Sequence, residues 1–121
     1  MRLFLCDDNA EYRKLVRLVL ERSGHEVVGE AGDGQAAIEA APEAQPEIVL
    51  LDLNMPSVNG FEALPELRRR LPDAKVFILT TGQAPQERQR ALDAGAHGFI
   101  IKPERVFALD AEIRTAITES G

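Results

Sequence analysis

Short apolar runs, separated by polar and turn-forming residues, recur along the whole chain. Most of these runs are continuous rather than alternating, as expected of strands that are buried on both faces of a parallel sheet. The predicted strands are Arg2–Cys6, Glu26–Ala31, Ile48–Leu51, Val76–Leu79 and Gly98–Ile101.

A helical pattern follows each predicted strand. After the first strand, apolar residues recur at helical spacing until a glycine: Tyr12, Leu15, Val16, Val19 and Gly24. The other predicted helices run from Gly34 to about Ala41, from near Gly60, from Pro85 to Gly95, and along the apolar face of Val106, Leu109, Ile113 and Ile117. Five strand-then-helix units in series predict an α/β fold, with one doubly wound five-stranded parallel sheet and helices on both faces.

Pro65 lies inside the helix that is expected after Gly60. A proline within a helix removes one backbone hydrogen bond and kinks or delays the helix. Two interpretations are open: the helix begins near Pro65, or it begins near Gly60 and is bent. We favour a helix that starts near Gly60 with an irregular first turn.

Composition and charge restrict the classes of function that this chain can have. With 121 residues, 45% of them hydrophobic, we expect a single domain over residues 1–121. The formal net charge of −6 argues against direct nucleic-acid binding by this chain, because such binding depends on basic patches. Without an apolar run of about 18 residues or a signal peptide, a cytoplasmic protein with no membrane association is expected. Cys6, the only cysteine, lies in an apolar run and is expected to be a buried, inert thiol.

Charged and polar side chains follow four of the five predicted strands. They are Asp7 and Asp8 after the first strand, Asp52 after the third, Thr80 after the fourth and Lys102 after the fifth. Ligands of open parallel sheets bind beyond the carboxyl ends of the strands, where these side chains are expected to meet. Three converging carboxylates repel one another, and Mg²⁺ is the natural cation to relieve this because it prefers oxygen ligands. A carboxylate can accept a phosphoryl group, and a lysine and a hydroxyl beside it can hold the phosphoryl oxygens.

Each of these residues also has a purely structural interpretation. The Asp7–Asp8 pair can cap the helix that follows it. Asp52 can be a turn residue, Thr80 a hydrogen-bonded hydroxyl at a strand end, and Lys102 a solvated side chain. The occurrence of all of them at the strand ends of one sheet favours a metal and phosphoryl site over separate structural roles.

Four short motifs occur in order along the chain. They are Cys6-Asp7-Asp8-Asn9, Leu50-Leu51-Asp52-Leu53-Asn54-Met55-Pro56 with Gly60, Ile78-Leu79-Thr80-Thr81, and Gly98-Phe99-Ile100-Ile101-Lys102-Pro103. Together they resemble the motifs of response-regulator receiver domains, and the resemblance runs from about Leu3 to Thr118. It implies a flavodoxin-like fold with strand order 2-1-3-4-5 and a phosphoacceptor switch of a two-component system, similar to the chemotaxis receivers.

The resemblance implies a role for each matching residue. Asp52 would take the phosphoryl group from a phosphohistidine of a partner histidine kinase or histidine phosphotransfer protein. Asp8 and Asp52 would bind Mg²⁺ directly, Asp7 would act through a water, and Asn54 would contribute its backbone carbonyl. The chain would then be a regulator that catalyses only its own phosphotransfer and slow autodephosphorylation.

The remaining motif residues would form the switch. Lys102 would bridge to the phosphoryl group, the Thr80 hydroxyl would turn inward to bind it, and Phe99 would turn inward after Thr80. The bond between Lys102 and Pro103 is expected to be cis, as in the family. The output surface would be the fourth helix, fifth strand and fifth helix, which is also a possible homodimer face. A downstream output domain or protein would read this surface.

Three other function classes share parts of the pattern. A haloacid-dehalogenase-type phosphatase would need a second acid two residues after Asp52, where the chain has Asn54. A flavodoxin-like FMN carrier would need a phosphate loop rich in Ser, Thr and Gly, where the chain has Asp7-Asp8-Asn9. A pseudo-receiver, which is a structural interaction module on the same fold, normally lacks one of the acids, the threonine or the lysine, and none is missing here.

A few residues depart from the pattern or lie outside it. Thr81 stands where receivers more often have Ala or Gly, and it is expected to narrow access to the site. His25 and His97 have no paired ligand spacing, and both are expected at the surface. The segment Val27–Gly34 resembles receivers joined to helix-turn-helix DNA-binding domains, which leaves open a free-standing receiver or part of a longer regulator.

Overall fold

A central sheet of five parallel strands organises the protein, whose computed structural model describes residues 1–53, 60–80, 85–102 and 106–119. The strands are β1 (Arg2–Cys6), β2 (Glu26–Ala31), β3 (Ile48–Asp52), β4 (Lys75–Thr80) and β5 (Gly98–Ile101). Their order across the sheet is β2-β1-β3-β4-β5, and every neighbouring pair is parallel. The predicted α/β architecture and the flavodoxin-like strand order are confirmed.

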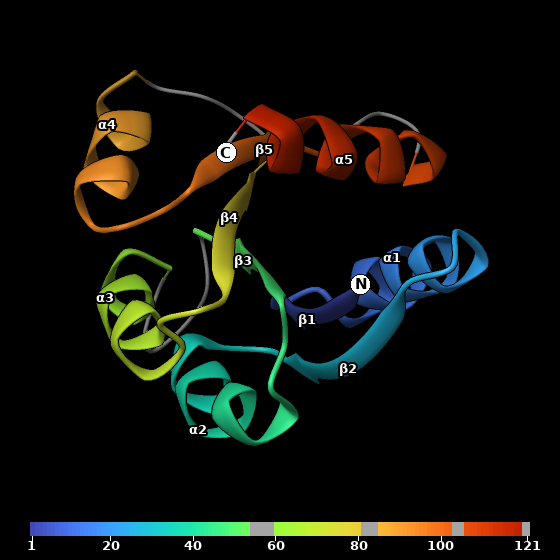
Figure 1. Cartoon of the computed structure of the whole chain (residues 1–121), viewed down its shortest axis with the longest axis horizontal. Helices are drawn as coiled ribbons and strands as arrows, with labels where there is room; N and C mark the ends of the chain where they lie inside the picture. Colours follow the sequence, from blue (N-terminus) through green and yellow to red (C-terminus); the bar gives the residue numbers. More distant parts are fainter. Residues whose placement is uncertain (54–59, 81–84, 103–105, 120–121) are drawn as a thin grey trace.

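Helices cover both faces of this sheet (Figure 1). The helices are α1 (Ala10–Arg22), α2 (Gly34–Ala44), α3 (Gly60–Arg70), α4 (Pro85–Asp93) and α5 (Leu109–Glu119), with a short 3-10 helix η1 (Val106–Ala108) before α5. Buried side chains of α2, α3 and α4 pack on one face, and those of α1 and α5 pack on the other. Among the residues that the structure describes, no helix is long and apolar enough to cross a membrane.

The middle strand β3 shows how the apolar runs build the core. All five of its residues are buried, and successive side chains point to opposite faces. Val49 and Leu51 pack with α2, α3 and α4, whereas Ile48 and Leu50 pack with α1 and α5. Complete burial of each such side chain contributes about 1.5–3 kcal/mol. A strand sandwiched in this way cannot carry a polar side chain until its end, which is where Asp52 lies.

Helix α3 tolerates the proline in its interior. It runs without a break from Gly60 through Pro65 to Arg70, so a start near Pro65 and an irregular first turn are both wrong. Pro65 is exposed, so water can satisfy the carbonyl that loses its partner, while the other face of the helix is buried around Leu64 and Leu67. Burial of that apolar face outweighs the one missing hydrogen bond.

The ends of two other helices differ from the predictions. Helix α2 continues to Ala44, beyond the predicted end near Ala41. The last helix begins at Leu109, because the preceding turn is a 3-10 helix that contains Val106. Leu109 and Ile113 are fully buried, as the predicted apolar face requires.

The two histidines are less exposed than predicted, because both are partly buried and both make hydrogen bonds. The His25 side chain is 9% exposed, and its Nε2 lies 2.6 Å from Asp110 Oδ1 at the start of α5. His97 is partly buried, and its Nδ1 accepts a hydrogen bond of 3.0 Å from the Val76 backbone N–H. Both contacts join segments that are far apart in the sequence, so local spacing could not reveal them.

Candidate functional site

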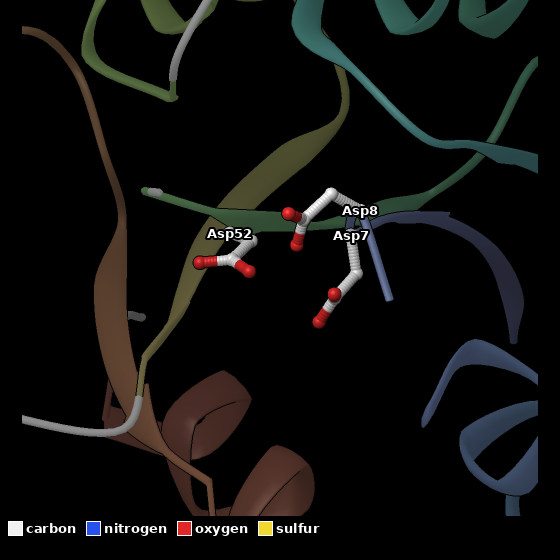
Figure 2. A group of neighbouring side chains, drawn as sticks. All are labelled: Asp7, Asp8 and Asp52. Atoms are coloured by element: carbon white, nitrogen blue, oxygen red, sulfur yellow. The ribbon is translucent and has the colours of Figure 1, made fainter. Parts of the chain in front are cut away.

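Three carboxylates meet at the carboxyl ends of β1 and β3 (Figure 2). Asp7 and Asp8 follow β1, and Asp52 is the last residue of β3, which pairs with β1 in the sheet. One carboxylate oxygen of each residue lies within 4.8 Å of the other two. Asp7 and Asp52 are 4% and 6% exposed, whereas Asp8 is open to solvent. The predicted convergence of these acids is therefore observed, and Asp8 gives the cluster a solvent-facing side.

Lys102 brings a positive charge to the same place from the end of β5. Its Nζ lies 2.8 Å from Asp7 Oδ2 and 3.5 Å from Asp52 Oδ2. Its backbone N–H donates to the Thr80 carbonyl at 2.7 Å, which ties the end of β5 to the end of β4. Burial by itself lowers the pKa of Lys102, but the hydrogen bond to Asp7 and the charge of Asp52 outweigh it, so this pKa is raised. The ammonium therefore stays charged beside the two buried acids.

Asp7 and Asp8 do not cap helix α1. The N-cap is Asn9, whose side-chain oxygen accepts the Tyr12 backbone N–H at 3.0 Å. Asp7 Oδ1 instead accepts the backbone N–H of Asn9 at 2.9 Å, and its other oxygen faces Lys102. The capping interpretation of the acidic pair is therefore wrong.

A group of hydrogen bonds and ion pairs from Arg13 and Arg17, which the sequence analysis missed, fixes the backbone at Asp7. The Arg13 guanidinium donates to the Asp7 carbonyl, and its Nε lies 3.2 Å from Glu30 Oε1 on β2. The second oxygen of Glu30 accepts from Arg17 Nη1 at 2.7 Å. The i, i+4 spacing of Arg13 and Arg17 places both on one face of α1, and this was the available signal. Together these contacts link α1, β2 and the end of β1.

Thr80 and Phe99 lie on the same face of the sheet. Thr80 pairs with Ile101 across β4 and β5, and Phe99 is two residues before Ile101 on the same strand. Side chains alternate along a strand, so paired residues and residues two apart share a face. Thr80 is 3% exposed, whereas Phe99 is partly exposed with the Arg88 guanidinium of α4 5.8 Å from its ring centroid. The two predicted switch residues are thus neighbours, one buried and one at the edge of α4.

Cys6 lies beside the acids without taking part. The thiol is 2% exposed, as predicted. Burial raises the pKa of Cys6 to about 12, and the negative charges of Asp33, Asp52 and Asp7 add to this effect. Cys6 therefore stays a neutral thiol and behaves as part of the core.

Three predicted positions lie outside the described residues. They are Asn54 with its carbonyl ligand, Thr81 with its effect on access, and Pro103 with the cis bond to Lys102. These roles stay predictions.

The donor set suits a hard divalent cation. Mg²⁺ prefers oxygen ligands, and it commonly binds through one or two carboxylates and keeps several waters. Three carboxylates oppose the single ammonium of Lys102, so the cluster keeps an excess of negative charge that a cation would offset. The open side at Asp8 leaves room for water or a phosphoryl group in the same coordination shell.

Comparisons with known proteins point to one family. The family model of the response regulator receiver domain matches residues 3–114. The chemotaxis protein CheY of Thermotoga maritima is 35% identical over 102 residues, which cover 84% of this chain and 85% of that protein. The nitrate/nitrite response regulator protein NarP of Escherichia coli is 40% identical over 102 residues, which cover 84% of this chain and 47% of NarP.

A solved structure shows the same fold. The signal receiver domain of the response regulator NarL from Mycobacterium tuberculosis is 33% identical in sequence. The two structures superpose with a TM-score of 0.83, and the aligned region covers 96% of this chain and 95% of that one. The chain spans about half the length of several of its curated relatives, NarP among them. Receiver domains of this kind bind Mg²⁺ at an acidic pocket and interact with histidine kinases and output domains. The chain belongs to the response regulator receiver domains, the phosphoacceptor regulators of two-component signalling.

Proposed function

We propose that Asp52 is the residue that accepts the phosphoryl group, from a phosphohistidine of a partner histidine kinase or histidine phosphotransfer protein. One observation carries the proposal. The Asp52 carboxylate lies at the end of a buried strand, 3.5 Å from the Lys102 ammonium and within 4.8 Å of two further carboxylates. Of the other two acids, Asp7 already accepts the backbone N–H of Asn9 with its Oδ1, and Asp8 is exposed to solvent.

The transfer is a displacement at phosphorus. A carboxylate oxygen of Asp52 forms a P–O bond as the P–N bond to the donor imidazole breaks, and the bonding electron pair leaves with the imidazole nitrogen. The Lys102 ammonium is close enough to Asp52 to donate to a phosphoryl oxygen on it, and Thr80 would supply a hydroxyl donor from β4. A Mg²⁺ ion held by Asp8, Asp52, a water on Asp7 and the Asn54 carbonyl would neutralise charge on the other phosphoryl oxygens.

The response would travel through β4 and β5. A phosphoryl group adds about −1.5 to −2 charge and three acceptor oxygens. It shifts the protein only through contacts that differ between the two states, which here are those of Thr80 and Lys102. An inward movement of Thr80 would act on Phe99, its neighbour on the same face, and so on α4. The α4–β5–α5 face is the proposed output and homodimer surface, and residues 86–90 of α4 are exposed.

The test is incubation with acetyl phosphate and Mg²⁺, read by intact mass. The expected result is a gain of one phosphoryl group that requires Mg²⁺ and is abolished by EDTA and by Asp52→Asn. Asp73→Asn, an exposed acid far from the cluster in the sequence, is the matched control and should still gain the group. A folded wild-type protein that gains nothing from small donors or kinases would be a pseudo-receiver, and gain by Asp52→Asn would place the acceptor elsewhere.

A further inference from the structure

We infer that Tyr12 is a positioning residue of this site, because its ring face holds the ammonium of Lys102 beside Asp52. This inference deepens the proposed function and rests on it. The Lys102 Nζ lies 4.6 Å from the centroid of the Tyr12 ring. An ammonium within about 6 Å of an aromatic centroid is attracted by the negative face of the ring. Lys102 therefore has an aromatic contact in addition to its contacts with Asp7 and Asp52.

The position of Tyr12 is well defined. It lies in the first turn of α1, where Asn9 caps the helix by accepting the Tyr12 backbone N–H. Its ring packs against the core on the α1 and α5 face. The ring is therefore held by both the helix cap and the core, and it can serve as a fixed surface for a flexible side chain.

Lys102 needs such a surface because its other partners change. A lysine carries its charge on a flexible four-carbon stem. The structure holds this charge through Asp7 and Asp52, the two acids that the proposed function assigns to the metal and the phosphoryl group. A metal ion bound to those acids would compete with the ammonium for their oxygens, and a phosphoryl group on Asp52 would offer it a new acceptor, so the carboxylate contacts of Lys102 change during the reaction. The ring of Tyr12 has no net charge to lose, so its attraction persists and keeps the ammonium next to Asp52.

The hydroxyl of Tyr12 is not needed for this contact, so a substitution can remove it and leave the ring in place. Its oxygen is buried, and it makes no hydrogen bond to any group in residues 1–53, 60–80, 85–102 or 106–119. Burial raises the pKa of Tyr12, although the charge of Lys102 opposes the effect, so the phenol stays neutral. Tyr12→Phe keeps the ring and removes only the hydroxyl, whereas Tyr12→Leu keeps an apolar side chain and removes the ring.

The first measurement uses the unphosphorylated protein without metal. Protons above the face of an aromatic ring are shielded, so the ε-methylene protons of Lys102 should resonate upfield of free lysine. We expect the upfield NMR shift in the wild type and in Tyr12→Phe, and its loss in Tyr12→Leu. An equal shift in Tyr12→Leu would show that the ring does not cover Lys102.

The second measurement is the rate of phosphorylation by acetyl phosphate with Mg²⁺. A partly buried cation–π contact corresponds to about a fivefold change in rate, so Tyr12→Leu should be slower by about this factor. Tyr12→Phe should recover most of the lost rate. Val16→Ala is the packing control, since Val16 is buried on the same face of α1 and lines the same small cavity as Tyr12.

The outcomes separate this inference from the proposed function. A wild type that is phosphorylated, with equal rates in Tyr12→Leu and Tyr12→Phe, overturns the positioning role and leaves the proposed function intact. A loss in Val16→Ala as large as that in Tyr12→Leu also overturns it, because packing would then be the cause. A wild type that is never phosphorylated removes the proposed function and the positioning role with it.

Discussion

The charge balance of the acidic cluster predicts that Asp8→Asn stabilises the protein when Mg²⁺ is absent. Asp8 is the exposed member of three carboxylates whose oxygens lie within 4.8 Å of one another. Lys102 contacts the other two acids, Asp7 and Asp52. Replacing Asp8 by the nearly isosteric asparagine removes two like-charge repulsions and leaves both ion pairs of Lys102 in place. The free energy of unfolding should therefore rise.

The size of the effect follows from the separation of the charges. At the limiting distance of 4.8 Å, two unit charges repel by about 0.9 kcal/mol in water and by about 3.5 kcal/mol at an effective dielectric constant of about 20. Asp8 is exposed, and part of its repulsion is offset by attraction to Lys102. We therefore expect a gain of about 1–2 kcal/mol for Asp8→Asn at low ionic strength.

Urea unfolding with EDTA, and again with Mg²⁺, measures the effect. Without Mg²⁺ the midpoint of Asp8→Asn should rise by about 0.5–1 M with an unchanged m value. With Mg²⁺ the wild type should gain about 2.7 kcal/mol at a concentration 100 times its dissociation constant, and the variant should gain much less. Asp73→Asn, an exposed acid outside the cluster, should change neither midpoint.

Salt provides an independent check. The gain from Asp8→Asn should shrink at high ionic strength, because salt screens the exposed charge of Asp8 against the two buried acids. A variant that is no more stable than the wild type in EDTA, or that responds to Mg²⁺ as the wild type does, would refute this account of the cluster.

Two further predictions concern packing and pH. Gly29→Ala should lower the free energy of unfolding, measured in urea, by about 1–3 kcal/mol, because the added Cβ would lie 2.7 Å from the ring of fully buried Phe4. Gly32→Ala is the control: its added Cβ would lie 3.4 Å from the nearest atom, so the loss should be smaller. Burial and two nearby basic charges lower the pKa of His97 from 6.5, and protonation would also break its bond to the Val76 N–H. The unfolded state then binds the proton more tightly, so stability should fall as the pH drops below 6.5 towards the folded pKa, and less so in His97→Gln. Equal acid profiles of the two proteins would contradict this.

The strands and the place of the site could be predicted because they depend on local patterns. A strand that is covered on both faces must be apolar along its length, so its first charged residue marks its end, as Asp52 does for β3. Parallel strands end at one edge, so acids after β1 and β3 were expected to meet, and their oxygens do lie within 4.8 Å. The predicted start of α3 near Gly60 is also observed.

Where the structure differs from the predictions, contacts with distant segments outweigh the preference suggested by the local sequence. Pro65 suggested an irregular helix start, but the burial of the opposite face of α3 outweighs one lost hydrogen bond. The sequence left open that the acidic pair caps α1, and the structure decides this, because Asn9 caps α1 and leaves Asp7 to face Lys102. His25 looked solvated, but α5 returns over it and supplies Asp110. In each case a neighbour in space decided the role of a residue whose neighbours in sequence were uninformative.

By itself the sequence determined the parallel sheet, the family motifs and the edge at which the acids gather, because periodicity and strand ends are properties of single segments. Only the tertiary structure decided which groups touch there. The ring of Tyr12 over Lys102 and the Arg13 guanidinium on the Asp7 carbonyl each bring together side chains from different elements. Such contacts depend on how α1 packs against the sheet, and no spacing within one segment encodes that geometry.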